Sequence, residues 1–139
     1  MLGKEKTENY LRNILNIQEK YGTVKSIDLA EALNVSKPTV SVAIHELEKE
    51  GYIIFSDNSG LFLTKKGMEL ASKIKGRYYF LFSMLKHMGV DEKDAKNDAC
   101  KMEHCMCDES FKVLWDMFYF FLEHSDKITR TDKPLDECG

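Results

Sequence analysis

The feature that most limits the fold of this chain is a pair of short runs of strand-forming residues. They directly follow a helical stretch that ends at a glycine. The runs are Tyr52–Phe55 and Leu61–Thr64, and the residues between them, 56–60, are turn formers. Two such runs joined by a short turn predict a β-hairpin. Elsewhere, apolar residues recur at the three- and four-residue spacing of amphipathic helices, and the only prolines are Pro38 and Pro134. The sequence therefore predicts a mainly α fold with one two-stranded hairpin.

Two short helices joined by a tight turn are expected ahead of the hairpin. Ser26 is expected to cap the first of them and Ser36 the second, with Pro38 in its first turn, where the missing N–H is not needed. Another amphipathic helix over 5–20 precedes both. Helix, turn, helix and hairpin together predict an N-terminal winged helix-turn-helix domain over residues 1–66. In such a domain the second helix enters the major groove of duplex DNA.

The N-terminal edge of this second helix supplies most of the predicted DNA contacts. Small hydroxyl side chains and one lysine allow close approach to phosphates and bases, and a threonine methyl can touch a thymine methyl. The hairpin tip and the lysine that follows it are suited to the DNA backbone. Because no Arg, Asn or Gln occupies the edge, we expect DNA shape and phosphate contacts to contribute much of the specificity. The predicted contact residues are Ser36, Lys37, Pro38, Thr39, Ser41, Asn58, Ser59 and Lys65.

Three helices are expected behind the hairpin, and they predict an all-helical dimerisation and metal-binding domain over 67–125. A long helix is predicted from 65 to 87, a second over about 92–105, and a third over about 108–124 with Asp108 as its cap. The last helix carries a stripe of aromatic residues, which we interpret as core and as contact with a second copy of the chain.

The charge of the chain is unevenly distributed. The net charge is −3, but residues 1–77 carry 12 basic and 10 acidic side chains, whereas residues 78–139 carry 8 and 13. DNA affinity depends on local rather than total charge, so the front half can still bind DNA. With no long apolar run, secretion signal or catalytic motif, we expect a cytoplasmic protein that contacts no membrane, is not an enzyme and takes no small-molecule substrate. Residues 126–139 are expected to form a flexible tail.

Residue types that bind metals cluster in the second of the rear helices. At about 100° per residue, Cys100, Glu103, His104 and Cys107 fall on one helix face, whereas Cys105 points away. A thiolate, a carboxylate and an imidazole at positions i, i+3 and i+4 can converge on one cation. This mixture of ligands suits Fe(II), Zn, Co or Ni better than Ca or Mg. We therefore predict a transition-metal site at the first three residues, with Cys107 as a further ligand.

Six blocks of sequence, in order and spacing, carry a family resemblance that extends from residue 5 to about 125. They are Thr7–Leu11, Asp28–Leu33, Val35–Ser41, Leu63–Gly67, Gly89–Asp91 and Asp98–His104. Together they resemble the diphtheria toxin repressor family of metal-dependent transcriptional regulators, in the short two-domain form of the manganese transport regulators. The resemblance implies a homodimer formed by the C-terminal helices, a divalent first-row metal, and repression of metal-uptake genes.

The resemblance also implies which residues hold the metal. Cys100, Glu103 and His104 align with three ligands of the family, and a ligand on the first helix falls at Asn9. Four residues differ from the acidic and histidine side chains that the family would place there: Arg12, Tyr78, Phe82 and Lys96. The resemblance therefore implies one site and leaves a second one open. Since that site contains sulfur, Fe(II) is favoured, with Zn, Co, Ni and Mn as alternatives.

Two other functions remain as alternatives to a repressor gated by a divalent metal. One is a thiol-based redox regulator on the same winged scaffold, which would use Cys100, Cys105, Cys107 and Cys138. The other is a metal-binding interaction module whose winged domain docks protein instead of DNA. In a repressor gated by a divalent metal, the mechanism is linkage. A metal that binds the DNA-competent arrangement better than other arrangements raises the affinity of the protein for its operator.

Overall fold

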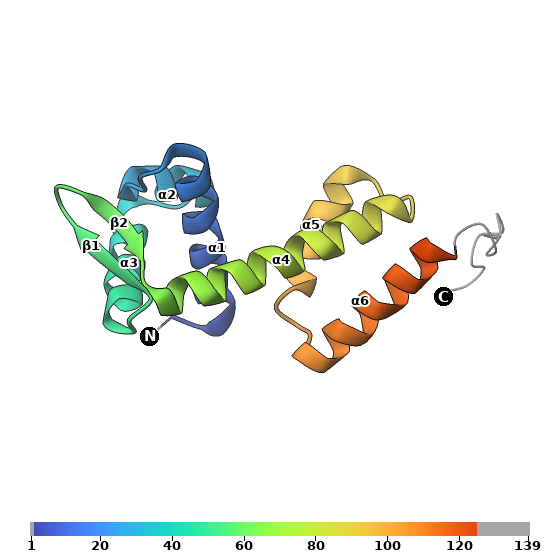
Figure 1. The fold of residues 1–139 in the computed structure, drawn as a ribbon. Helices are drawn as coiled ribbons and strands as arrows, with labels where there is room; N and C mark the ends of the chain where they lie inside the picture. The colour runs from blue at the N-terminus through green and yellow to red at the C-terminus, as the bar shows by residue number, and fades with distance from the viewer. Residues whose placement is uncertain (1, 125–139) are drawn as a thin grey trace. The chain divides into compact units, whose positions relative to one another are not determined.

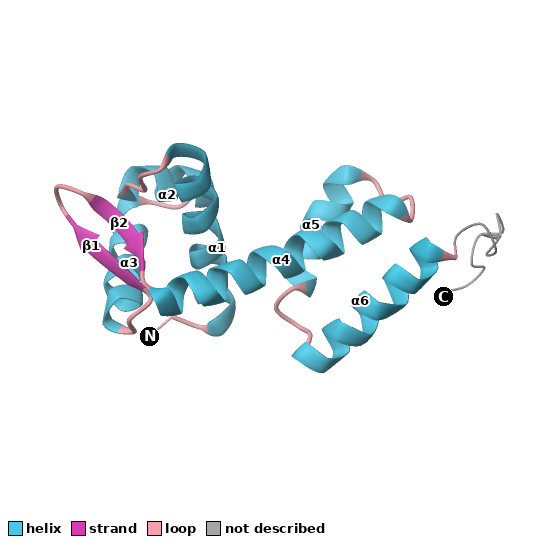
Figure 2. Cartoon of the chain, viewed as in Figure 1, coloured by secondary structure: helices cyan, strands magenta, loops and turns pink. Residues whose placement is uncertain are grey.

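The computed structural model describes residues 2–124, which divide into one unit ending at Cys105 and a second beginning at Met106. The described part contains six helices and one antiparallel two-stranded sheet (Figures 1 and 2). The predicted tail, 126–139, and Cys138 lie outside the described residues. The elements are α1 (Lys4–Tyr21), α2 (Ser26–Leu33), α3 (Lys37–Lys49), β1 (Ile53–Ser56), β2 (Gly60–Leu63), α4 (Lys65–His87), α5 (Glu92–Met102) and α6 (Asp108–Glu123).

Helices α2 and α3 form the predicted helix-turn-helix. Asn34 takes the left-handed conformation between them (φ 53°), and Ser36 caps α3 by accepting the backbone N–H of Thr39 at 3.3 Å. The predicted cap of α2 is wrong by one residue. The extended residue before this helix is Lys25, whose backbone N–H is bonded to the Asp28 carboxylate at 3.1 Å, so that Ser26 is already helical.

The wing is the hairpin β1–β2, shifted by one residue from the predicted strands. Ile53 pairs with Leu63 and Ser56 with Gly60. Two further bonds connect the hairpin to the helices: the N–H of Leu61 donates to the carbonyl of Val24 at 2.8 Å, and the N–H of Phe55 donates to the carboxylate of Glu48 at 2.9 Å. The wing is therefore bonded both to the segment before α2 and to α3.

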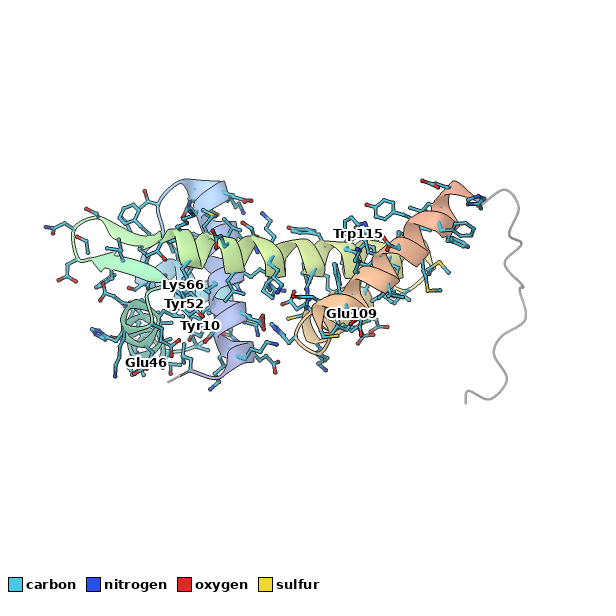
Figure 3. All side chains as sticks on the ribbon, turned by 60° about the horizontal axis from the view of Figure 1, so that its bottom comes forward. Tyr10, Glu46, Tyr52, Lys66, Glu109 and Trp115 are labelled. Carbon is cyan, nitrogen blue, oxygen red and sulfur yellow. The ribbon has the colours of Figure 1, made fainter. Side chains whose placement is uncertain are left out.

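Helix α4 begins in direct contact with the wing. Thr64 caps it by accepting the N–H of Gly67 at 3.1 Å. Lys66 lies 4.3 Å from the centre of the Tyr52 ring and donates to the carbonyl of Glu50 at 2.8 Å (Figure 3). The absence of a side chain at Gly67 lets the backbone of α4 approach that of Tyr52, because a Cβ there would lie 2.0 Å from the Tyr52 carbonyl oxygen. The wing and the start of α4 thus form one packed piece.

Helix α1 belongs to the core of the winged domain and also packs along α4 (Figure 1). Its residues Leu11 and Ile14 are fully buried, in one cluster with Leu47 of α3 and Leu61 of the wing. Helix α4 continues beyond α1 to pack against α5. One helix therefore contacts both the winged domain, through α1 and β2, and the helix that carries the predicted metal residues.

The two predicted rear-helix boundaries need correction. Helix α5 ends at Met102, earlier than the expected 105. The N–H of His104 bonds to the carbonyl of Lys101 and the N–H of Cys105 to that of Met102, so residues 104 and 105 make the shorter-range bonds of a turn. Helix α6 is capped by Cys107 rather than Asp108: the Ser110 N–H donates to the Cys107 sulfur at 3.4 Å. No residue of α6 is buried within the described chain. None of the described helices is long and apolar enough to cross a membrane.

The contact at Gly67 gives a paired test within one helix. We expect Gly67→Ala to lower the free energy of unfolding by about 2 kcal/mol or more, because the backbone of Tyr52 would have to move. Gly76 is also in α4, but a Cβ there meets nothing within 4 Å. Gly76→Ala should instead raise the free energy of unfolding by about 0.5–1 kcal/mol through helix propensity. Urea unfolding followed by circular dichroism measures both, and equal effects would contradict the prediction.

Candidate metal centre

The end of α5 brings three potential metal ligands together. Cys100 lies in the last turn of α5, Glu103 is its C-cap and His104 follows. One ligand atom from each of the three lies within 4.8 Å of the others. Glu103 still donates its N–H to the carbonyl of Ala99, so the i, i+3, i+4 spacing holds although the helix has formally ended. The side chains of Glu103 and His104 are 0% and 6% exposed.

Helix α1 contributes two side chains to this cluster. The amide oxygen of Asn9 lies 3.1 Å from His104 Nε2 and 3.8 Å from the Cys100 sulfur. The carboxylate of Glu8, itself buried, lies 3.3 Å from His104 Nδ1. Asn9 was predicted from the sequence, whereas Glu8 was not. A carboxylate on the same inward face as Leu11, one turn earlier, was the signal that could have indicated it.

The donor atoms suit a bound cation. When Nδ1–H of His104 donates to Glu8, Nε2 carries a lone pair instead of a proton. Nε2 lies 3.1 Å from Asn9 Oδ1 and 3.1 Å from Glu103 Oε1. These three acceptor atoms then converge with no ring proton between them. Ligand atoms around a tetrahedral zinc-like ion stand about 3.3–3.8 Å apart, close to these separations. Glu103 Oε2 is buried with no hydrogen-bond partner among the described residues. A divalent metal fits this arrangement of acceptor atoms. The buried oxygen of Glu103 without a partner is the observation that most favours such a metal.

An arginine of α1 also enters the cluster. Arg12 Nη1 donates to Glu103 Oε1 at 2.9 Å, and Nη2 lies 3.5 Å from the Cys100 sulfur. The guanidinium carbon stands 4.5 Å from the centre of the Tyr78 ring. From α4, Arg77 donates to the carbonyl of Glu103 at 3.4 Å. Arg12, which differs from the side chain that the family would place there, thus forms an ion pair with Glu103.

Burial dominates the ionisation of Glu103. Desolvation raises the pKa of this carboxyl to about 7, although the nearby charges of Arg12 and Arg77 act to lower it and Glu8 adds to the rise. Both protonation states are therefore accessible near neutral pH. A cation beside the carboxylate favours its charged form, so that metal binding and deprotonation of Glu103 go together.

The other residues singled out from the sequence lie apart from this cluster. Cys107 caps α6 and is exposed, since the chain leaves the helix after Met102 and does not continue the face predicted for a longer α5. Cys105 is exposed and its thiol donates to the carbonyl of Lys101 at 3.1 Å. Phe82 stacks on Tyr78, and Lys96 is exposed. In the described residues, the group able to hold a metal consists of Cys100, Glu103 and His104.

All residues predicted to contact DNA are exposed. The hydroxyls of Ser36 and Thr39 are 2.8 Å apart and hydrogen-bond to each other, which holds the first turn of α3. The sequence reasoning missed Val42, which is 63% exposed on α3. Its signal was available: Val42 falls outside the inward stripe of the helix, in contrast to its neighbours Ala43 and Ile44. An exposed valine on a reading helix is suited to the methyl group of thymine.

Comparison with known proteins gives two family matches in tandem. Residues 1–61 match the iron dependent repressor, N-terminal DNA binding domain, and residues 64–129 match the iron dependent repressor, metal binding and dimerisation domain. An uncharacterized HTH-type transcriptional regulator of Methanocaldococcus jannaschii is 33% identical over 123 residues, 87% of this chain and 96% of that protein. The HTH-type transcriptional regulator MntR of Bacillus subtilis is 32% identical over 116 residues, 84% and 82% of the two chains.

Solved structures give the same picture. A manganese-dependent transcriptional repressor in complex with manganese superposes with a TM-score of 0.72 at 25% identity, over 82% of this chain and 53% of that one. The manganese regulator SloR superposes with a TM-score of 0.68 at 25% identity, over 85% and 54%. The chain thus spans about half the length of these solved proteins.

The thiol of Cys107 should be more reactive than that of Cys105, the other exposed cysteine among the described residues. Hydrogen bonding with the side chain and the backbone N–H of Ser110 lowers the pKa of Cys107, so more of it is thiolate at neutral pH. We expect iodoacetamide at pH 7 to alkylate Cys107 faster than Cys105, and the difference to shrink as the pH rises toward 9. Fragment-ion mass spectrometry distinguishes the two sites.

The matched control for this prediction is Ser110→Ala, which removes the hydroxyl but keeps the backbone N–H. It should slow alkylation of Cys107 and leave Cys105 unchanged. Equal rates at both cysteines in the unmodified chain would contradict the prediction, and would also weaken the thiol-based alternative.

Proposed function

Since the chain belongs to the iron-dependent repressor family, we propose that it is a metal-responsive transcriptional repressor that binds duplex operator DNA as a homodimer. The observation that carries this proposal is the buried cluster of acceptor atoms between α1 and α5, in a chain whose α1 is also part of the winged domain. Residues 1–66 would bind DNA, and residues 67–125 would serve dimerisation and metal binding. A bound divalent cation would supply positive charge in addition to that of Arg12, which is paired with Glu103.

The proposed ligands come from two helices. Cys100, Glu103 and His104 belong to the end of α5, and Asn9 belongs to α1. Glu8 would accept the hydrogen bond of Nδ1–H of His104, which leaves the lone pair of Nε2 available for a metal. Because α1 and α5 each provide ligand atoms, the ligands can all be engaged only when the two helices keep their present separation.

The connection to DNA runs through the core. Leu11 and Ile14, on the same helix as Asn9, are buried against α3 and the wing, so a fixed α1 also fixes the reading helix. Ligand engagement at the cluster is then linked to one arrangement of the winged domain. By linkage, whatever favours this arrangement also raises the affinity for DNA, and DNA in turn raises the affinity for the metal.

We propose Fe(II) as the preferred metal. Several relatives are named as manganese regulators, and manganese is the main alternative. The thiolate of Cys100 is a softer ligand than the oxygens that suit manganese, and with an imidazole and a carboxylate it favours Fe(II), Zn, Co or Ni. The metal preference therefore depends on one side chain, which makes it open to a direct test.

For DNA, the proposed contacts are the exposed first turns of α3 together with the wing. Ser36, Lys37, Pro38, Thr39 and Ser41 would approach phosphates and base edges, with Val42 added as a partner for thymine methyl groups. Asn58, Ser59 and Lys65 would contact the backbone of the duplex.

Metal gating predicts a difference in DNA affinity. Duplexes selected from a random library with metal-loaded protein should bind at least about tenfold more weakly when a chelator replaces Fe(II), because metal–ligand bonds from α1 and α5 then no longer favour the DNA-competent arrangement. Fluorescence anisotropy under anaerobic conditions measures this. Cys100→Ala should reduce the difference. Equal affinities with Fe(II), with Mn(II) and with chelator would contradict metal gating.

Cobalt provides a direct test of the ligands. Co(II) bound to the thiolate of Cys100 should give a near-ultraviolet charge-transfer band, which Cys100→Ser should abolish. Cys105→Ser is the matched control, since Cys105 lies outside the cluster, and it should leave the band unchanged. A band that survives in Cys100→Ser but disappears in Cys105→Ser would overturn the assigned site.

A further inference from the structure

Arg12 introduces a positive charge into a cluster that is suited to binding a metal. We propose that Arg12 is a resident cation of this centre: it connects α1 to α5 in the metal-free protein, and its charge lowers the affinity for the metal. Arg12 would therefore set the metal concentration at which the repressor responds. This inference rests on the proposed metal centre, but its first half concerns the metal-free protein alone.

The contacts of Arg12 show how firmly it is held. One nitrogen donates to Glu103 at 2.9 Å, a second lies 3.5 Å from the Cys100 sulfur, and the ring of Tyr78 covers the guanidinium at 4.5 Å. The side chain of Arg12 is 11% exposed and that of Glu103 is 0% exposed. An ion pair buried to this extent is weakly screened by solvent, and removing one partner leaves the other charge uncompensated.

Charge counting explains why a metal and Arg12 can share the centre. The thiolate of Cys100 and the carboxylates of Glu103 and Glu8 carry three negative charges when all are ionised. One divalent ion and the guanidinium of Arg12 together match these three charges, and Arg77 adds a further positive charge at the carbonyl of Glu103. The acidic groups can therefore accept a single metal in addition to Arg12, whose side chain cannot lose its proton.

Arg12 and a metal nevertheless repel each other. Both are cations, and both use Glu103 and Cys100 as partners, so metal binding has to proceed against the field of the guanidinium. Arg12 therefore has two effects of opposite sign. It stabilises the metal-free protein, and it weakens metal binding. If Arg12 had a merely structural role, its removal would destabilise the metal-free protein and would leave metal binding unchanged or weaken it.

The test compares Arg12→Gln with the unmodified chain in two measurements. In chelator, the melting temperature of Arg12→Gln should fall by about 5 °C or more, since Glu103 loses its partner. In a competition titration with a coloured chelator, the same variant should bind Co(II) about tenfold more tightly or better, because a like charge has been removed. Arg12→Lys keeps the charge and should stay near the unmodified chain in Co(II) affinity.

Lys75→Gln is the matched control. Lys75 of α4 forms an ion pair with Glu19 of α1 outside the centre, so its loss should leave Co(II) affinity unchanged. Unchanged or weaker Co(II) binding by Arg12→Gln would overturn the electrostatic half of the proposal, and an unchanged melting temperature in chelator would overturn the other half. If the unmodified chain bound no Co(II), the proposed metal centre would fail, whereas the melting comparison would still decide whether Arg12 connects the helices.

Discussion

The buried carboxylate of Glu103 is the constraint on which the arrangement of this protein depends. It lies at the end of α5 without solvent contact, and a charged group in that position requires positive partners. Arg12 from α1 donates to the carboxylate and Arg77 from α4 donates to the backbone carbonyl of the same residue, so three helices meet at Glu103. The second oxygen of Glu103 has no partner among the described residues. In an ordinary internal ion pair both carboxylate oxygens have partners. The oxygen of Glu103 without a partner distinguishes this centre from such a pair and leaves an acceptor for a further cation.

Helix α1 has a double role that follows from its amphipathic pattern. Leu11 and Ile14 fill the core of the winged domain, while Asn9 and Arg12 reach α5. A helix of this kind belongs to neither half alone. Its position is set by apolar packing on one side and by charge on the other, and under the proposed function only the second of these would respond to metal concentration.

Much of the fold was predictable because it depends on local rules. The predicted helix-turn-helix, the wing and the bounds of α4 are confirmed, since capping residues, glycine and apolar periodicity act over a few positions. The errors were also local: at α2 and α6 the cap lies one residue earlier, and the sulfur of Cys107 took the role expected of Asp108. Periodicity also predicted that Cys100, Glu103 and His104 share a face. The Arg12–Glu103 pair needed the tertiary structure, because 91 residues separate Arg12 from Glu103.

The close contact between Gly67 and Tyr52 has a mechanical consequence. At this contact two backbones touch, and no side chain lies between them that could change rotamer to absorb a movement. The wing must therefore move together with α4 when α4 tilts. Tyr78 lies 13 residues along α4 from Lys65, about 20 Å of helix. If α4 tilts by about 3° about Tyr78, its start at Lys65 and the attached wing move by about 1 Å. A shift of this size is enough to lengthen a hydrogen bond to a phosphate beyond its useful range.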